Sequence, residues 1–224
     1  MIEKRRITDT CIALLYSLAI ISCTTQTRES QIQTATLSRE SQIQIAFSLT
    51  SDHFKNTARV KDDSLDTIAT ISTANGFQEI PEQLGTVCND NFLRAFIDKK
   101  SGKKSFQVYQ IVYTQDNNKV GWSFFQSVNF ETPSGPSSKP VRNIKTDIEC
   151  KGSLGCLYVE HIAFDVDETL LRTIANQYTP GQQLAWKFRL NSKSGKSYND
   201  AILPAEIAGL LDRVDEYVSS HGLP

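Results

Sequence analysis

The sequence lacks a long apolar run and an excess of charge of either sign. No apolar stretch reaches about 18 residues, the length that predicts a membrane-spanning helix, so we expect no permanent span. The 24 Lys and Arg residues are opposed by 25 Asp and Glu residues, which gives a formal charge of −1. This balance excludes the basic field on which nucleic-acid binding depends, and we predict no nucleic-acid partner.

The remaining composition is that of an ordinary folded protein. Apolar residues make up 39% and charged residues 22% of the 224 residues, which excludes wholesale disorder. A chain of this length can bury one substantial core, so we expect a single folded domain after any leader.

The first 23 residues have the pattern of a secretory leader. Lys4, Arg5 and Arg6 form a short basic block, and an apolar stretch of 11 residues follows from Cys11 to Ile21. A basic block before a short apolar segment predicts a signal peptide. The segment is too short to cross a bilayer stably.

The leader ends in Ile20-Ile21-Ser22-Cys23, which resembles the lipobox of bacterial lipoproteins. The resemblance implies that residues 1–22 are removed and that Cys23 carries acyl chains, palmitate among them, which anchor the protein to a membrane. Thr24 stands where an Asp would retain an enterobacterial lipoprotein at the inner membrane, which implies the outer membrane, facing the periplasm. The inner membrane, or an ordinary signal peptide with a chance cysteine, are the alternatives.

The segment after the anchor is polar. It contains Arg-Glu-Ser-Gln-Ile-Gln twice, at 28–33 and 39–44, which is too few copies for a repeat architecture. We predict a flexible tether over 23–42 and a single globular domain over 43–224.

The domain is predicted to be α+β: an antiparallel β meander or sandwich with one internal helix and a C-terminal helix. Period-two apolar patterns predict strands at 92–97, 106–113, 122–130, 157–164 and 184–190. Lys-Ser-Gly-Lys occurs at 100–103 and 193–196 and predicts two hairpin turns, with a further turn over 115–119. Residues 129–140 contain three prolines and are predicted to form a loop.

Side-chain patterns assign faces to these elements. One face of the strand at 122–130 should carry Trp122, Phe124, Val128 and Phe130. One face of the strand at 184–190 should carry Leu184, Trp186, Phe188 and Leu190. The internal helix should bury Leu170, Leu171, Ile174, Ala175 and Tyr178. The C-terminal helix should bury Ile207, Leu210, Leu211, Val214 and Val218, with Pro204 in its first turn and Gly222 beyond its end.

The string Phe-Asp-Val-Asp-Glu-Thr-Leu at 164–170 resembles the DxDxT signature of the haloacid-dehalogenase phosphatases, which include lipoprotein acid phosphatases. The resemblance implies that Asp165 attacks phosphorus, that Asp167 is the general acid and base, and that magnesium bridges carboxylate and phosphate. That family needs a Lys and an acidic pair on later strands of a parallel sheet, and only 55 residues follow Thr169. The preferred interpretation is that Asp165 or Asp167 caps a helix, and that Glu168 interacts with its positive end.

The cysteines predict one disulfide, and the histidines predict no metal site. Cys150 and Cys156 bracket a flexible Lys-Gly-Ser-Leu-Gly turn, and in an oxidising periplasm this spacing predicts a disulfide. Cys88 would then remain a free, buried thiol. His161 has Glu160 beside it but no ligand at metal-binding spacing, so we predict neither a metal nor a cofactor.

These features predict a membrane-anchored lipoprotein that faces the periplasm and acts by binding or by supporting envelope structure, not by catalysis. A phosphohydrolase acting through Asp165 and Asp167 is the alternative. A third hypothesis is an accessory protein that docks onto a larger envelope assembly, its protein partner, through the aromatic face of a sheet.

Overall fold

The computed structural model describes residues 41–78, 89–115, 121–150 and 156–224. The leader with Cys23, the tether up to residue 40, Cys88 and residues 116–119 of the turn predicted over 115–119 lie outside the described residues. Residues 41–48 are helical, so the last two residues assigned to the tether belong to a helix. Among the described helices, none combines the length and the apolarity that crossing a membrane requires.

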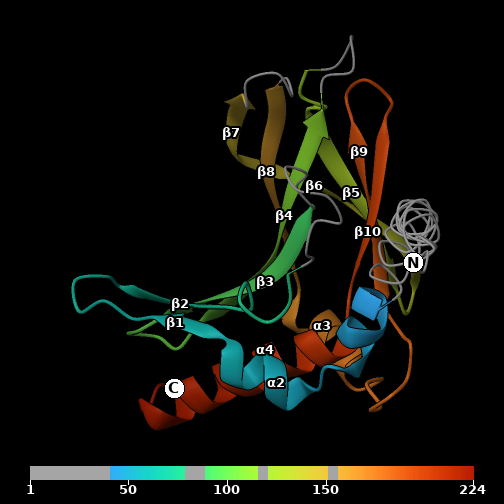
Figure 1. The fold of residues 1–224 in the computed structure, drawn as a ribbon. Helices are drawn as coiled ribbons and strands as arrows, with labels where there is room; N and C mark the ends of the chain where they lie inside the picture. The colour runs from blue at the N-terminus through green and yellow to red at the C-terminus, as the bar shows by residue number, and fades with distance from the viewer. Residues whose placement is uncertain (1–40, 79–88, 116–120, 151–155) are drawn as a thin grey trace, which may run out of the picture. The chain divides into compact units, whose positions relative to one another are not determined.

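Residues 44–224 carry two antiparallel sheets with helices at one end (Figure 1). The strands are β1 Arg59–Lys61, β2 Ile68–Ser72, β3 Asp90–Asp98, β4 Lys104–Gln115, β5 Phe125–Thr132, β6 Gly135–Pro140, β7 Arg142–Cys150, β8 Cys156–Val166, β9 Trp186–Ser192 and β10 Ser197–Ile202. The helices are α2 Ser51–Thr57, α3 Glu168–Ala175 and α4 Pro204–Ser220. The strand orders are β1-β2-β3-β4-β8-β7 and β10-β9-β5-β6. The α+β prediction, with an internal and a C-terminal helix, is confirmed.

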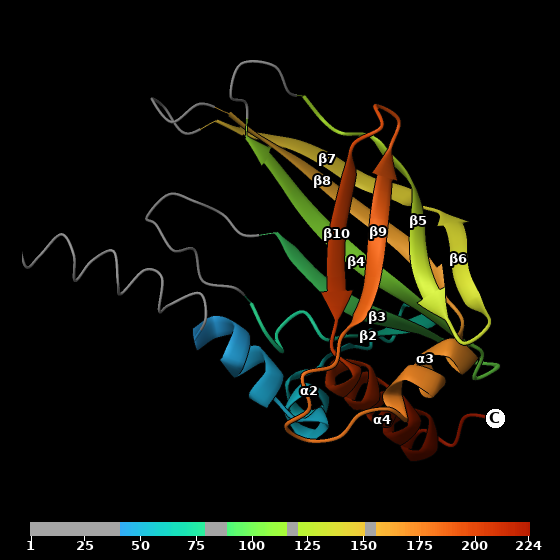
Figure 2. The ribbon, with the colours of Figure 1, turned by 90° about the vertical axis from the view of Figure 1, so that its right-hand side faces the viewer.

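The two sheets pack face to face, with β9, β10 and β5 in front of β4 and β8 in Figure 2. Aromatic side chains fill the space between them. The ring of Phe164 on β8 lies 5.3 Å from Phe188 on β9 and 6.1 Å from Phe130 on β5, between centroids. None of the three side chains is more than 4% exposed. Such ring pairs add an electrostatic preference to the burial of apolar area, so this cluster joins the sheets.

Helix α4 closes one end of the core. Most of its predicted apolar face is buried, with Ile207, Leu210 and Val214 fully covered and Val218 partly buried. Helix α2, which the sequence patterns did not predict, crosses α4 at Gly209, where a Cβ atom would lie 2.5 Å from the carbonyl oxygen of Ser51. Only glycine permits this approach of the two backbones.

The hairpin predictions are confirmed. Strands β3 and β4 pair antiparallel across a turn at 99–103, and β9 and β10 pair across the turn that contains Gly195. Gly102 and Gly195 have φ values of 66° and 80°, the left-handed conformation that these turns require.

Some local predictions are wrong. Helix α3 ends at Ala175, so Tyr178 lies beyond the helix and not on its buried face. Residues 135–140 form strand β6 rather than a loop, because β6 is an edge strand, where the missing amide protons of Pro136 and Pro140 need no partner on the outer side. Phe124 does not share the buried face of Val128 and Phe130. A register shift between Phe125 and Ser127 puts Phe125 in the core and leaves Phe124 52% exposed.

Candidate functional site

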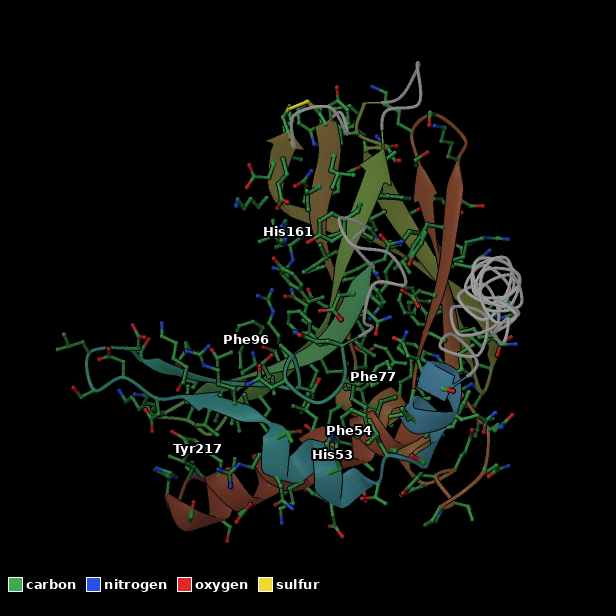
Figure 3. The ribbon with its side chains drawn as sticks, in the orientation of Figure 1. His53, Phe54, Phe77, Phe96, His161 and Tyr217 are labelled. Carbon is green, nitrogen blue, oxygen red and sulfur yellow. A yellow bond between two sulfur atoms is a disulfide. The ribbon has the colours of Figure 1, made fainter. Side chains whose placement is uncertain are left out.

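The six-stranded sheet has one face that packs on the core and one that does not. On β3, the fully buried Leu93, Ala95 and Ile97 alternate with Phe92, Arg94 and Phe96, which lie on the other face. We call this second face the outer face. Figure 3 shows Phe96 and His161 on this side of the sheet, away from β9 and α4.

Strand register brings side chains from four strands together on the outer face. Arg94 is opposite Gln107, and Gln107 is opposite Asp165. Phe92 is opposite Tyr109. Further along β8 is His161, and Arg142 of β7 is opposite Ala163, which lies between His161 and Asp165 on β8. We call the seven residues other than Ala163, together with Phe96, the outer-face cluster.

Aromatic rings and one guanidinium group form the centre of the cluster. The rings of Phe92 and Tyr109 stack with centroids 4.9 Å apart and an interplanar angle of 22°. The guanidinium carbon of Arg94 lies 4.2 Å from the Tyr109 ring centroid and 5.4 Å from that of Phe96. These distances are within the range of cation–π attraction, so the two rings fix the position of the Arg94 head group.

A chain of polar contacts extends across the same face. Arg94 donates to the amide oxygen of Gln107, whose Nε2 donates to Asp165 over 3.2 Å. Arg142 donates to the same Asp165 oxygen. Separately, the Tyr109 hydroxyl lies 3.0 Å from Nδ1 of His161. The cluster is therefore a connected surface that spans β3, β4, β8 and β7.

Partial burial sets the charge state of this surface. Burial lowers the pKa of His161, and the nearby Lys145 ammonium lowers it further. Burial also raises the pKa of Tyr109. Both side chains are therefore neutral at pH 7, and Arg94, Arg142 and Lys145 supply the positive charge.

One donor of Arg94 is buried without a partner in the part of the chain that the structure describes. Its Nε atom is covered from solvent and has no hydrogen-bond partner among the described residues. A buried donor without an acceptor costs about 1–3 kcal/mol.

The two aspartates of the DxDxT string lie in different environments. Asp165 is on the outer face, where it is paired with Arg142. Asp167 occupies the N-cap position of α3, but its side chain makes no cap hydrogen bond and instead pairs with Lys139 at 2.9 Å. The prediction that an aspartate side chain caps α3 is wrong, because a cation from the adjacent β6 competes for that carboxylate. Glu168 lies in the first turn, as predicted, and pairs with Lys104 at 3.0 Å.

Asp167 borders a groove between α3 and the β5–β6 hairpin. Pro133, Leu170 and Thr173 line it, and Lys139 lies beside Asp167 at its rim. The lining mixes apolar side chains with polar ones from Ser, Thr, Lys and Asp residues, and Asp165 is not part of it. The strand before the motif, β8, pairs antiparallel with both neighbours, unlike the parallel sheet that the resemblance to the phosphatases implies.

Glu160 and His161 do not converge. They are neighbours on β8 and point to opposite sides of the sheet. Glu160 is 1% exposed and accepts hydrogen bonds from the backbone amides of Ser123 and, at 2.9 Å, Phe124. The part of the chain that the structure describes contains no group of three His, Cys, Asp or Glu side chains able to hold a metal.

The predicted cysteine pair lies at the far ends of β7 and β8, where Cys150 is opposite Cys156. Their sulfur atoms are 2.04 Å apart, a disulfide distance, and the bond is visible in Figure 3. The pair is outside the outer-face cluster, so it contributes to the sheet and not to the candidate site.

Comparison with known proteins adds nothing to this geometry: no protein family, curated protein or solved structure matches the chain. Sequence reasoning singled out Asp165 and His161 but missed Arg94 and Tyr109. The available signal was the alternation of Phe92, Arg94 and Phe96 with buried aliphatic residues. Only the strand register shows that these residues meet Tyr109 and His161.

Proposed function

We propose that this protein is a lipid-anchored, periplasm-facing binding protein that holds a protein partner of the cell envelope on the outer face of its six-stranded sheet. The observation that carries the proposal is the packing of Arg94 against the rings of Tyr109 and Phe96 on a face that is not part of the core.

The composition of the cluster favours a protein as the partner. Aromatic residues and arginine are enriched at protein interfaces and account for most of their strongest contacts. Arg94 is held by two rings and a glutamine before any partner binds, so little side-chain entropy is lost on binding. Asp165 and Arg142, each about 60% exposed, supply a polar rim.

Binding explains these residues better than catalysis does. Each aspartate of the DxDxT string is paired with a cation of its own, Arg142 or Lys139. If the protein is not a phosphohydrolase, Asp165→Asn and Asp167→Asn leave magnesium-dependent turnover of a phosphate ester at the level of a blank. Turnover by the unaltered protein that disappears in Asp165→Asn would favour the enzyme.

The binding surface is tested with a photo-crosslinking amino acid in the full chain, expressed in cells. At position 96 it should yield a crosslinked envelope protein that mass spectrometry identifies. The matched control is position 189 on β9, where Arg189 is exposed on the four-stranded sheet. Equal crosslinking at both positions, or crosslinking at 189 alone, would contradict the proposed surface.

The anchor rests on the residues before Cys23 and has a separate test. Metabolic labelling with a clickable fatty acid should label the protein, and Cys23→Ala should abolish the label and release the protein from the membrane. Label retained by the variant would refute lipidation at Cys23. Non-reducing peptide mapping of the same material should find Cys150 and Cys156 in one linked peptide pair, as expected in the periplasm.

A further inference from the structure

Strand β7 is an edge strand with most of its length uncovered. It is the last strand of the six-stranded sheet, and no described strand pairs with its outer side. Eight of its nine residues are exposed, and Asp147 is half-buried. A free edge of this length offers its backbone groups to another strand.

The other free edges are less suited to pairing. Strand β1 has only three residues. Strand β6 carries two prolines, which cannot donate hydrogen bonds. Strand β10 has six residues, and four of these are half-buried or buried. Among the described edges, β7 is therefore the longest and the most exposed.

The charges of β7 are separated along its length. Arg142 and Lys145 are in its first half, and Asp147 and Glu149 are in its second half. In an antiparallel pair of two identical strands, the first half of each strand faces the second half of the other. Opposite charges then meet twice, once on each side of the two-fold axis.

One register also matches the apolar residues. With Thr146 on the two-fold axis, Lys145 is opposite Asp147 of the second copy, and Ile144 is opposite Ile148. The two isoleucines are each 46% exposed in the single chain. The two Thr146 residues face each other. Opposite charges, threonine pairs and branched apolar pairs all stabilise neighbouring strands.

From this complementarity we infer that β7 pairs antiparallel with β7 of a second copy of the chain, joining two six-stranded sheets into one. In the single chain Lys145 pairs with Asp147 of its own strand at 2.5 Å. In the paired register each of these two side chains also lies opposite an unlike charge of the second copy. Ile144 lies at the bulge between Asn143 and Lys145, so the regular pairing spans Lys145–Asp147, with Ile144 and Ile148 at its two ends. The pairing strand carries Arg142 of the outer-face cluster, whereas the other members lie on β3, β4 and β8. The inference does not depend on the proposed function.

The pairing is tested by disulfide trapping in the full chain, in isolated membranes. Residues opposite each other on antiparallel strands are close enough for a disulfide, so Thr146→Cys should give a covalent dimer under mild oxidation. The matched control is Ser138→Cys, an exposed position on edge strand β6, and the unaltered chain gives the background from its own cysteines. Dimer formation at 146 that does not exceed the control, or a crosslink from 146 to a different protein, would overturn the inference.

Charge reversal then tests the register. In the Thr146→Cys background, Lys145→Asp or Asp147→Lys alone replaces two attractive pairs between the copies with two repulsive ones and also breaks the Lys145–Asp147 pair within each strand. Each should lower the dimer fraction at least about fivefold. The double exchange, Lys145→Asp with Asp147→Lys, should restore it to within about twofold. A double exchange that dimerises no better than the single variants would contradict the register. Circular dichroism of each variant shows whether the fold is retained, as expected for surface positions.

Discussion

The two faces of β3 and β4 are built from the same strands but are held in different ways. The inner face carries Leu93, Ile97 and Val108, each fully buried in the core. The outer face carries Arg94, Tyr109 and their neighbours, which are joined by ring stacking and polar contacts. The inner face therefore contributes mainly to the free energy of folding. The outer face presents a pre-formed arrangement of groups, and a substitution there should reduce stability less than one on the inner face.

The largest effect is expected from a loss on the inner side. Phe164→Ala removes the ring that joins β8 to both β5 and β9. Truncating a fully buried phenylalanine costs about 3–5 kcal/mol, through lost burial and the cavity that remains. Urea denaturation of the variant and the unaltered protein measures the difference. A loss below about 1 kcal/mol would show that this cluster does not join the sheets.

A smaller effect on stability is expected from the ionisation of Glu206, whose carboxyl is buried at the start of α4. Burial raises the pKa of Glu206 to about 7, although Thr73 donates a hydrogen bond to the carboxylate at 2.5 Å. Since the folded state then binds a proton more tightly than the unfolded chain, this group favours folding at low pH. Its contribution declines as pH rises through about 7, by on the order of 3 kcal/mol in total.

Unfolding free energies at pH 5 and pH 8 test this sign. The decline between the two values should be clearly smaller in Glu206→Gln, because glutamine does not titrate. The comparison between the two proteins cancels the opposite contribution of His161, whose pKa burial lowers. Equal pH dependence in both proteins would mean that Glu206 is ionised in the fold throughout this range.

The smallest effect is expected on the outer face. Tyr109→Phe keeps the ring that stacks on Phe92 and removes only the hydroxyl that contacts His161. A partly buried hydrogen bond contributes about 1 kcal/mol, so the melting temperature should fall by only a few degrees. Differential scanning calorimetry measures it. A loss as large as that of Phe164→Ala would remove the distinction between the two faces.

Sequence patterns predicted those parts of the fold in which one face is buried. Alternation located β3, β4, β8 and β9, and a helical period located α4, because the core selects apolar residues at regular positions. Strand β7 has no buried face and hence no pattern. It forms because its backbone pairs with β8.

The errors have local causes. The exposed Phe124 follows from a bulge, which shifts the alternation of β5 by one residue and has no signature in composition. The candidate site was only partly predictable for a similar reason. The motif at 164–170 drew attention to Asp165, but the residues that contact it, Gln107 and Arg142, lie on β4 and β7. A short sequence motif does not reveal the register between strands that are distant in the sequence.

The most direct test of the outer face as the binding surface is Arg94→Ala, measured by the photo-crosslink from position 96 in cells. Its control is Arg189→Ala, which removes an exposed arginine from the other sheet. Truncating a central interface arginine costs more than about 1.4 kcal/mol, so Arg94→Ala should reduce the crosslinked partner at least about tenfold, and Arg189→Ala should leave it unchanged. A crosslink that persists in Arg94→Ala, or that is lost equally in Arg189→Ala, would contradict the account.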